Sequence, residues 1–323
     1  MKKITYRFLE LILCNLMFYG LVYGQTFPNK PIRLIVPFEA GGTSDFTARL
    51  IAQQLESKFK TSVIVENRPG ANGVIAAGIV SQSKPDGYTL LHTTPAFIIN
   101  PLINKSLSYD VFKDFVPVSN IGIGTGYVLV VNPALPIKSV NDLLAYAKSK
   151  HNELTYASPG VGNALHLAAA QFVDKTAIKG IHVPYKGTAA GLLAVSAGDV
   201  DFMILPPTVV FSFVQSGKVK LIAFTGQKRS ADFPNTPTLA ESGLKDLTIS
   251  STWLGWFAPS ATPVDVVNVI ANEIQSILKD PEVQADLMKS GFRVEPRTPV
   301  EFQGFLKSEY SRIGQIVKKI DLN

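Results

Sequence analysis

Short apolar runs alternate along the chain with segments of helical periodicity. The apolar runs, rich in β-branched residues, predict strands at 32–38, 62–66, 89–94, 128–131, 154–157, 181–185, 200–205, 221–225 and 253–258. The helical patterns between many of them predict helices at 45–59, 74–83, 140–150, 163–174, 188–197 and 264–279. This alternation predicts an α/β fold of parallel sheets with helices on both faces. Because ligands of such sheets bind beyond the carboxyl ends of the strands, the residues that follow each strand are the candidates for a site.

Length and composition indicate a folded chain with two domains. The 323 residues are 46% hydrophobic and 17% charged, which excludes an intrinsically disordered chain. At roughly 100–200 residues per domain, this length predicts two domains. The formal net charge is +6, and the longest basic runs are pairs such as Lys228-Arg229 and Lys318-Lys319. Nucleic-acid binding usually needs a basic stripe interleaved with aromatic residues, so we expect no nucleic-acid partner.

Residues 1–24 have the features of a signal peptide. Basic residues precede a mostly apolar stretch at 11–23, as in exported proteins. Val22 and Gly24 are small enough for the −3 and −1 positions, which predicts cleavage between Gly24 and Gln25 and a periplasmic protein. An uncleaved membrane anchor is the alternative, but the stretch is shorter than the about 20 residues that cross a bilayer.

Cysteine and histidine usage excludes several kinds of site. The only cysteine, Cys14, lies in the apolar stretch and is lost on cleavage. The exported chain would therefore hold no disulfide, thiol nucleophile or cysteine zinc site. The four histidines, at positions 92, 151, 166 and 182, show no metal-ligand spacing, so we expect no metal.

One class of function to consider is an exported enzyme. Gly160-Val161-Gly162 matches part of a dinucleotide fingerprint, but the third small residue is missing and no acidic residue ends the next strand. No Gly-x-Ser-x-Gly or His-Glu-x-x-His motif occurs, and the two Ser-x-x-Lys matches lack a supporting Lys-Thr-Gly element. The sequence shows no nucleophile–base pair, so we expect neither catalysis nor a cofactor.

The first candidate anion site spans residues 37–45, between a predicted strand and a predicted helix. Gly41 and Gly42 let the backbone turn without a Cβ clash, so that amide groups can point outward. Thr43 or Ser44 can cap the helix, whose free N–H groups and dipole favour a negative guest. The alternative is an ordinary strand–helix turn with an N-cap.

The second candidate spans residues 156–163, again from strand to helix. Asn163 can cap this helix, and His166 falls in its first turn. Because the positive helix end disfavours an imidazolium, we expect a neutral His166 that donates one hydrogen bond. The alternative is a histidine that only packs. Two further candidates lie at the end of the predicted strand 181–185. Tyr185 has an apolar ring with a hydroxyl group. Lys186 either faces the ligand or is a charge on the surface.

An ordered series of sequence blocks resembles the Bug family, the exported solute receptors of tripartite tricarboxylate transporters. The resemblance covers about the whole mature chain. The blocks are KPIRLIVPF (30–38) with Gly41, Gly42, Asp45 and Ala48-Arg49, VENRPG (65–70), PDGYTLL (85–91), YAS (156–158) with Gly160, Gly162 and His166-Leu167, HVPYKG (182–187), KRS (228–230), Pro237-Thr238, Trp253 and Ala258-Pro259. One departure is Asn163, where the family often has Ser.

The resemblance implies a type II periplasmic binding protein with two Rossmann-like lobes, two crossovers and a ligand cleft between the lobes. Residues 25–125 and 225–323 would form the first lobe, and residues 126–224 the second. A small carboxylate would be held by main-chain amides and waters rather than by an arginine clamp. The implied partners of this monomeric receptor are a membrane permease or a sensor kinase.

The implied ligand-binding residues come from both lobes. They are Phe38, Gly41, Thr43, Ser44, Asp45, Ser158, Gly160, Gly162, Asn163 and His166, with Tyr185 and Lys186 nearby. Apart from the resemblance, Thr94 at the end of one strand and Asp201 in another are further candidate ligand-binding residues, without a motif of their own. Two orientations of Asp45 are open. If its carboxylate faces the cleft, it favours amino acids or hydroxylated ligands; if it turns into its own helix, plain carboxylates fit better.

Overall fold

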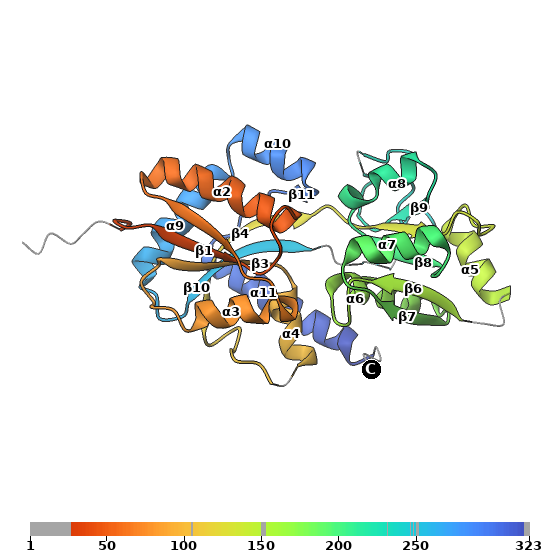
Figure 1. The fold of residues 1–323 in the computed structure, drawn as a ribbon, viewed down its shortest axis with the longest axis horizontal. Helices are drawn as coiled ribbons and strands as arrows, with labels where there is room; N and C mark the ends of the chain where they lie inside the picture. The colour runs from red at the N-terminus through yellow and green to blue at the C-terminus, as the bar shows by residue number, and fades with distance from the viewer. Residues whose placement is uncertain are drawn as a thin grey trace, which may run out of the picture.

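The computed structural model describes residues 27–319, apart from residues 105, 150–152, 231, 246, 248 and 250–251. They form two β-sheets covered by helices, arranged as two halves along the long axis of the molecule (Figure 1). The predicted α/β class is confirmed. The predicted signal peptide at 1–24 and its cleavage site lie outside the described residues. None of the described helices has both the length and the apolar character to cross a membrane.

The first sheet has six strands in the order β11-β4-β10-β3-β1-β2. Its strands are β1 (Ile32–Val36), β2 (Val63–Asn67), β3 (Thr89–Thr93), β4 (Phe115–Gly124), β10 (Trp253–Pro259) and β11 (Phe292–Arg293). β1 pairs in parallel with β2 and β3. β10 pairs antiparallel with β3 and β4, and β11 pairs antiparallel with β4. The expectation of purely parallel sheets is therefore wrong, because β10 enters the sheet in the opposite direction.

Helices bury both faces of the first sheet. Neighbouring residues of β1 point to opposite faces, so that Leu34 packs in one buried cluster with Trp256, and Ile35 packs in the other with Phe97. The helices on the first face are α2 (Thr43–Phe59), α9 (Val264–Ile277) and α10 (Pro281–Lys289). Those on the second face are α3 (Val74–Ser81), α4 (Ala96–Ile103) and α11 (Pro299–Val317), and the 3-10 turn η1 (Ala71–Gly73) precedes α3.

The second sheet has five strands in the order β7-β6-β8-β5-β9. Its strands are β5 (Val128–Val131), β6 (Leu154–Ser158), β7 (Gly180–Pro184), β8 (Phe202–Leu205) and β9 (Lys220–Phe224). β6 pairs in parallel with β7 and β8, whereas β5 pairs antiparallel with β8 and β9. Its helices are α5 (Val140–Ser149), α6 (Ala164–Thr176), α7 (Thr188–Ala197) and α8 (Phe211–Gln215), with the turn η2 (Pro207–Val209) before α8.

Two crossover segments connect the sheets, one from β4 to β5 and one from β9 to β10. They touch backbone to backbone: Gly126 has a φ of +142°, and a Cβ there would lie 2.7 Å from the amide nitrogen of Gly226. The Tyr127 amide donates a hydrogen bond to Thr225 Oγ1 at 2.8 Å. The two crossovers are therefore in close contact at Gly126, and this close approach depends on glycine.

Several described residues between 226 and 249 pack with the second sheet, although the predicted boundary at 225 assigns them to the first lobe. Leu239, Leu247 and Ile249 belong to the buried cluster of the five-stranded sheet. Phe224 pairs with Thr238 through a parallel bridge. This packing favours a boundary after Ile249, because Leu239, Leu247 and Ile249 belong to the core of the second sheet.

Candidate functional site

A pocket of about 590 Å³ lies between the two halves. This volume is in the range of pockets that bind small solutes. The predicted residues that line it are Phe38, Thr43, Ser44, Thr94, Gly160 and Asn163. The predicted residues that do not line it are Gly41, Asp45, Ser158, Gly162, His166, Tyr185, Lys186 and Asp201. The pocket therefore joins both predicted glycine loops, but through only part of each.

Helix α2 presents an uncapped N-terminus to the pocket. Gly42 is the N-cap residue, no side chain caps the helix, and Gly42, Thr43 and Ser44 all line the pocket. The Ser44 hydroxyl oxygen is buried and has no hydrogen-bond partner within the described chain. The first amides of a helix have no partner inside the helix, and the helix dipole places partial positive charge there. This wall can therefore donate hydrogen bonds to an anion.

The Asp45 carboxylate bonds to its own loop and helix rather than facing the pocket. It accepts hydrogen bonds from the Gly41 amide at 2.9 Å, from Arg49 Nε at 3.0 Å and from Asn67 Nδ2 at 2.9 Å. Burial alone would raise the pKa of Asp45, but the hydrogen bonds from Arg49, Gly41 and Asn67 outweigh burial and hold that pKa below its usual value. The Gly41 amide is consequently not free for a ligand.

The second glycine loop uses several of its own donors internally. The Gly160 amide donates to Ser158 Oγ at 3.1 Å, and the Gly162 amide donates to His166 Nδ1 at 3.1 Å. The Asn163 side chain caps α6 by accepting a bond from a first-turn amide at 3.0 Å. Gly160 and Asn163 thus shape the pocket wall, while the loop offers fewer free amides than the sequence suggests.

His166 lies behind this loop and does not line the pocket. It is 1% exposed, and its ring stacks on His182 with the centroids 3.6 Å apart. Burial and, next, the neighbouring His182 lower the pKa of His166 to about 4, so the ring is neutral at neutral pH. Since Nδ1 accepts a bond from Gly162, we assign the proton of the neutral ring to Nε2. His166 therefore positions the loop and does not donate into the pocket.

The N-terminus of helix α7 forms a third wall, which the sequence indicated only through its neighbours. Gly187 is the N-cap residue without a side-chain cap, and it lines the pocket together with Thr188. Tyr185 packs against the core of the second sheet, and Lys186 is exposed outside the pocket lining. The sequence signal that could have identified this wall is a strand followed by a glycine and a helix, here β7, Gly187 and α7. The same pattern occurs at residues 37–45.

Segments without a recognisable motif complete the pocket. Tyr127 and Thr252 come from the crossovers, residues 206–208 follow β8, and residues 290–292 follow α10. Asp201 lies elsewhere, because its carboxylate accepts bonds from the Thr155 amide and hydroxyl at 2.8 and 3.0 Å. Through these bonds, Asp201 holds the start of β8 against Thr155 of β6.

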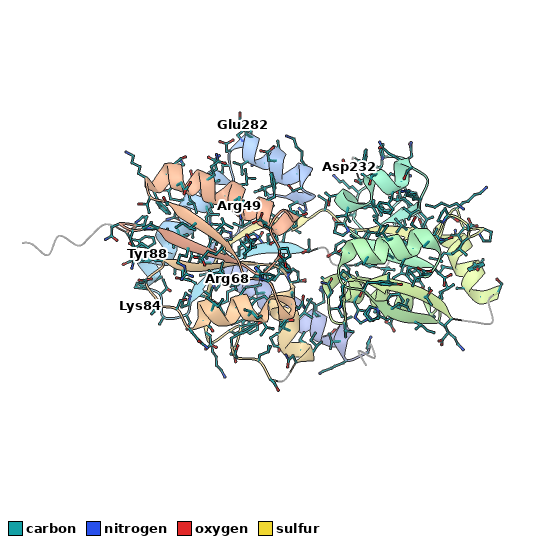
Figure 2. The ribbon with its side chains drawn as sticks, in the orientation of Figure 1. Arg49, Arg68, Lys84, Tyr88, Asp232 and Glu282 are labelled. Carbon is teal, nitrogen blue, oxygen red and sulfur yellow. The ribbon has the colours of Figure 1, made fainter. Side chains whose placement is uncertain are left out.

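The pocket lining carries little charge. Glu39 is the one charged residue among the lining residues that the structure describes. Arg49 and Arg68, labelled in Figure 2, lie on the six-stranded half; Arg49 bonds to Asp45, and Arg68 bonds to Glu66 at 3.1 Å. Across residues 27–319 with their gaps, no group of three or more His, Cys, Asp or Glu side chains is placed to hold a metal ion.

One contact bears on catalysis. Ser158 Oγ lies 2.6 Å from His182 Nε2, a pairing that the sequence did not reveal. Ser158 is 0% exposed, does not line the pocket, and also donates to the Gly160 carbonyl oxygen at 3.0 Å. A solute in the pocket therefore does not meet this hydroxyl.

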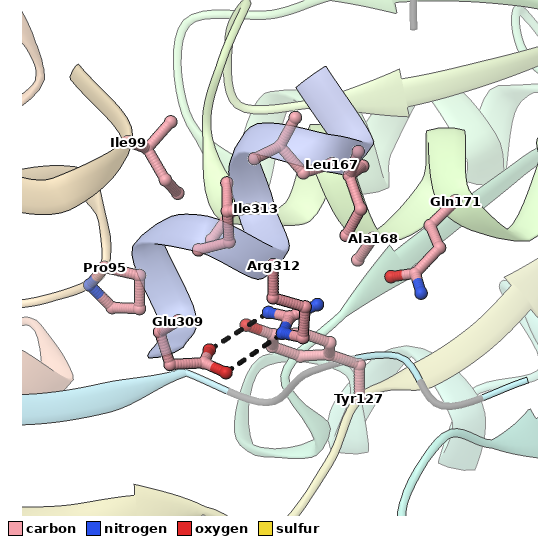
Figure 3. A pocket seen from close by; sticks show the side chains of 11 residues that line it. Pro95, Ile99, Tyr127, Leu167, Ala168, Gln171, Glu309, Arg312 and Ile313 are labelled. Atoms are coloured by element: carbon pink, nitrogen blue, oxygen red, sulfur yellow. Dashed lines mark hydrogen bonds and ion pairs between the residues drawn. The ribbon is translucent and has the colours of Figure 1, made fainter. Parts of the chain in front are cut away.

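A second cavity also borders Tyr127 but is too small for a solute. Its volume is about 30 Å³, close to that of one water molecule. Leu167 of α6 and Ile313 of α11 line it, and Figure 3 shows the Glu309–Arg312 ion pair at its edge. The large pocket is therefore the candidate site.

Comparison with known proteins agrees with this architecture. Residues 47–322 match the family described as "Tripartite tricarboxylate transporter family receptor". Protein BugT of Bordetella pertussis is 31% identical over 300 residues, which cover 92% of this chain and 91% of that protein. A UPF0065 protein of Cupriavidus necator, in the gbd 5′ region, is 33% identical over 299 residues, covering 92% of this chain and 89% of that protein.

Solved structures share the fold over nearly the whole chain. Rpa4515 of R. palustris, solved with adipate, has 31% identity and a TM-score of 0.81, covering 90% of this chain and 97% of that chain. MatC (Rpa3494) of Rhodopseudomonas palustris, solved with bound malate, has 28% identity and a TM-score of 0.77, covering 90% of this chain and all of that chain. The two-lobed periplasmic binding fold is confirmed, and this chain belongs to the tripartite tricarboxylate transporter receptor family.

Proposed function

We propose that this chain is an exported receptor, which captures a small carboxylate between its lobes and delivers it to a tripartite tricarboxylate-type permease. The observation that carries the proposal is the meeting of two uncapped helix N-termini, those of α2 and α7, at one pocket. The described lining of that pocket holds no arginine, lysine or histidine. Helix N-termini and hydroxyl groups can bind an anion without a counter-charge. The adipate and malate complexes of its relatives support this solute class.

Capture follows from the position of the pocket between the two halves. The solute meets one wall first, and rotation about the crossovers brings the opposite wall into contact. A hydrogen bond to a charged group contributes about 1.5–3 kcal/mol net. A micromolar Kd needs about 8 kcal/mol after the costs of ordering, which several such bonds from α2 and α7 can supply.

A ligand screen by thermal unfolding tests the function. At a concentration of 100 times its Kd, a bound acid should stabilise the chain by about 2.7 kcal/mol. The panel contains mono-, di- and tricarboxylates and amino acids at matched ionic strength, with chloride as the control. A receptor returns the acid chemically unchanged after prolonged incubation, whereas an enzyme does not. If no acid raises the melting temperature of folded protein, the proposal fails.

The Ser44→Ala variant tests the α2 wall. We expect about tenfold weaker carboxylate binding, the worth of one hydrogen bond to a charged group, as measured by calorimetry. The melting temperature without ligand should not fall, because the Ser44 hydroxyl has no partner within the described chain. Ser57→Ala is the matched control, since Ser57 lies on the same helix, is exposed and donates to the Gln53 carbonyl at 3.3 Å. Equal affinities in the two variants would remove Ser44 from the site.

A further inference from the structure

Glu39 stands out on the pocket wall because of its charge. It lies between β1 and the start of α2, lines the pocket, and is exposed. Its carboxylate makes no hydrogen bond or ion pair to any other residue of the described chain. An exposed, unpaired carboxylate beside an anion pocket works against binding unless the solute itself makes use of it.

Cations on the elements that flank Glu39 are already engaged. Arg49 of α2 is paired with Asp45 at 3.0 Å, and Arg68, which follows β2, is paired with Glu66 at 3.1 Å. Across the pocket, Lys186 is exposed but does not belong to the lining. A solute in the pocket therefore meets the charge of Glu39 without a compensating arginine or lysine among the described lining residues.

We propose that Glu39 is a specificity-determining residue, which selects carboxylates with an ammonium group and disfavours solutes with a second carboxylate. This inference rests on the proposed function, because it concerns the same pocket. The donors of α2 and α7 hold one carboxylate. A second carboxylate is repelled by Glu39, whereas an ammonium group pairs with it. Asp45 cannot supply this negative charge, since its oxygens bond to Gly41, Arg49 and Asn67.

Acids that share a carbon chain and differ in one group test the proposal. For six carbons they are adipate, 6-aminohexanoate, 2-aminohexanoate and hexanoate, and matching sets with four and five carbons are measured with them. In the wild-type chain, the best amino acid should bind at least about tenfold more tightly than the diacid of the same length. Glu39→Gln should remove that preference, because it weakens binding of the amino acid and strengthens binding of the diacid. The plain monocarboxylate, which places no second charged group beside Glu39, should gain less affinity than the diacid.

Two controls separate the charge of Glu39 from other effects. Glu282→Gln removes the same charge on the outer side of α10 (Figure 2) and should leave every affinity unchanged. Lys186→Gln tests whether Lys186 pairs with the second carboxylate of a diacid. If it does, this variant should bind diacids more weakly than the wild type; if it does not, diacid binding should stay the same. Glu39→Gln should melt at the same temperature as the wild type, because Glu39 has no partner to lose in the described chain.

The outcomes distinguish the two proposals. Tight diacid binding by the wild type, or an unchanged ratio of amino acid to diacid affinity in Glu39→Gln, overturns the role of Glu39 but leaves a carboxylate receptor. A specific loss of diacid binding in Lys186→Gln also overturns it. If none of the acids at any chain length binds the wild type, the proposed function itself fails.

Discussion

Replacing Asp45 with alanine is expected to lower the free energy of unfolding by about 3 kcal/mol, an effect on stability before any effect on ligand choice. The buried carboxylate ties the first glycine loop to α2 and to the end of β2 through Gly41, Arg49 and Asn67. Its removal leaves the Gly41 amide and the Asn67 side chain without their acceptor. Thermal or urea unfolding of the ligand-free chain measures the loss.

The acid range gives an independent check on Asp45. Because the pKa of Asp45 is lowered in the folded chain, its contribution is present at neutral pH and is lost as the pH falls below about 4, where the carboxylate of the unfolded chain takes up a proton. The stability of Asp45→Ala should therefore depend less on pH in that range.

Asp286→Ala is the matched control for this variant. Asp286 also pairs with a cation on its own helix, at 2.9 Å from Lys289, but both side chains are exposed. Such a pair contributes at most about 1 kcal/mol. If Asp45→Ala is as stable as Asp286→Ala and instead reorders the affinities for amino acids and plain acids, then Asp45 faces the solute and our account of the loop is wrong.

The orientation of Asp45 shows where sequence reasoning reached its limit in the site. The glycine pair followed by Thr, Ser and Asp predicted a helix start, and α2 does begin at Thr43, but Gly42 rather than Thr43 or Ser44 is the N-cap residue. Which way the carboxylate turns depends on Asn67, which β2 brings alongside from 22 residues away. Likewise, the donor bonds within the second loop depend on His166 and Ser158 being folded against it. Local spacing identifies the loop, but tertiary contacts decide which donors stay free.

Among the elements of the fold, most of those with a clear local sequence pattern were predicted, whereas β4, which is buried by contacts with distant strands, was not. Strands such as β1 and β8 were predicted because uninterrupted apolar runs are typical of strands buried on both faces. β4 was not predicted, since Pro117, Ser119, Asn120 and Gly122 interrupt its sequence, yet Ser119 and Asn120 are 0% exposed between β10 and β11. Helix α11 was also missed, although its capping box of Thr298 and Glu301 is a sequence signal that could have located it.

The Gly126→Ala variant is expected to lose about 3 kcal/mol of stability and most of its solute binding. Gly126 has a φ of +142°, which disfavours any residue with a Cβ. The new Cβ would lie 2.7 Å from the Gly226 amide nitrogen and 2.7 Å from Phe224 Cζ. Gly226 belongs to the crossover from β9 to β10, and Phe224 is the last residue of β9. To relieve the clash, the two crossovers must therefore move apart. The lobes would then no longer close on the solute in the same register.

Gly217→Ala separates crowding from backbone strain in this experiment. Gly217 also has a positive φ, of +68°, but a Cβ there would meet no atom within 4 Å. It should cost only about 1–2 kcal/mol, the conformational penalty of a left-handed residue, and should not affect the Kd. If the Gly126 variant behaves in the same way, the close approach of the crossovers does not control capture. A larger loss of stability together with a weakened Kd would instead show that this contact sets how the two walls of the pocket come together.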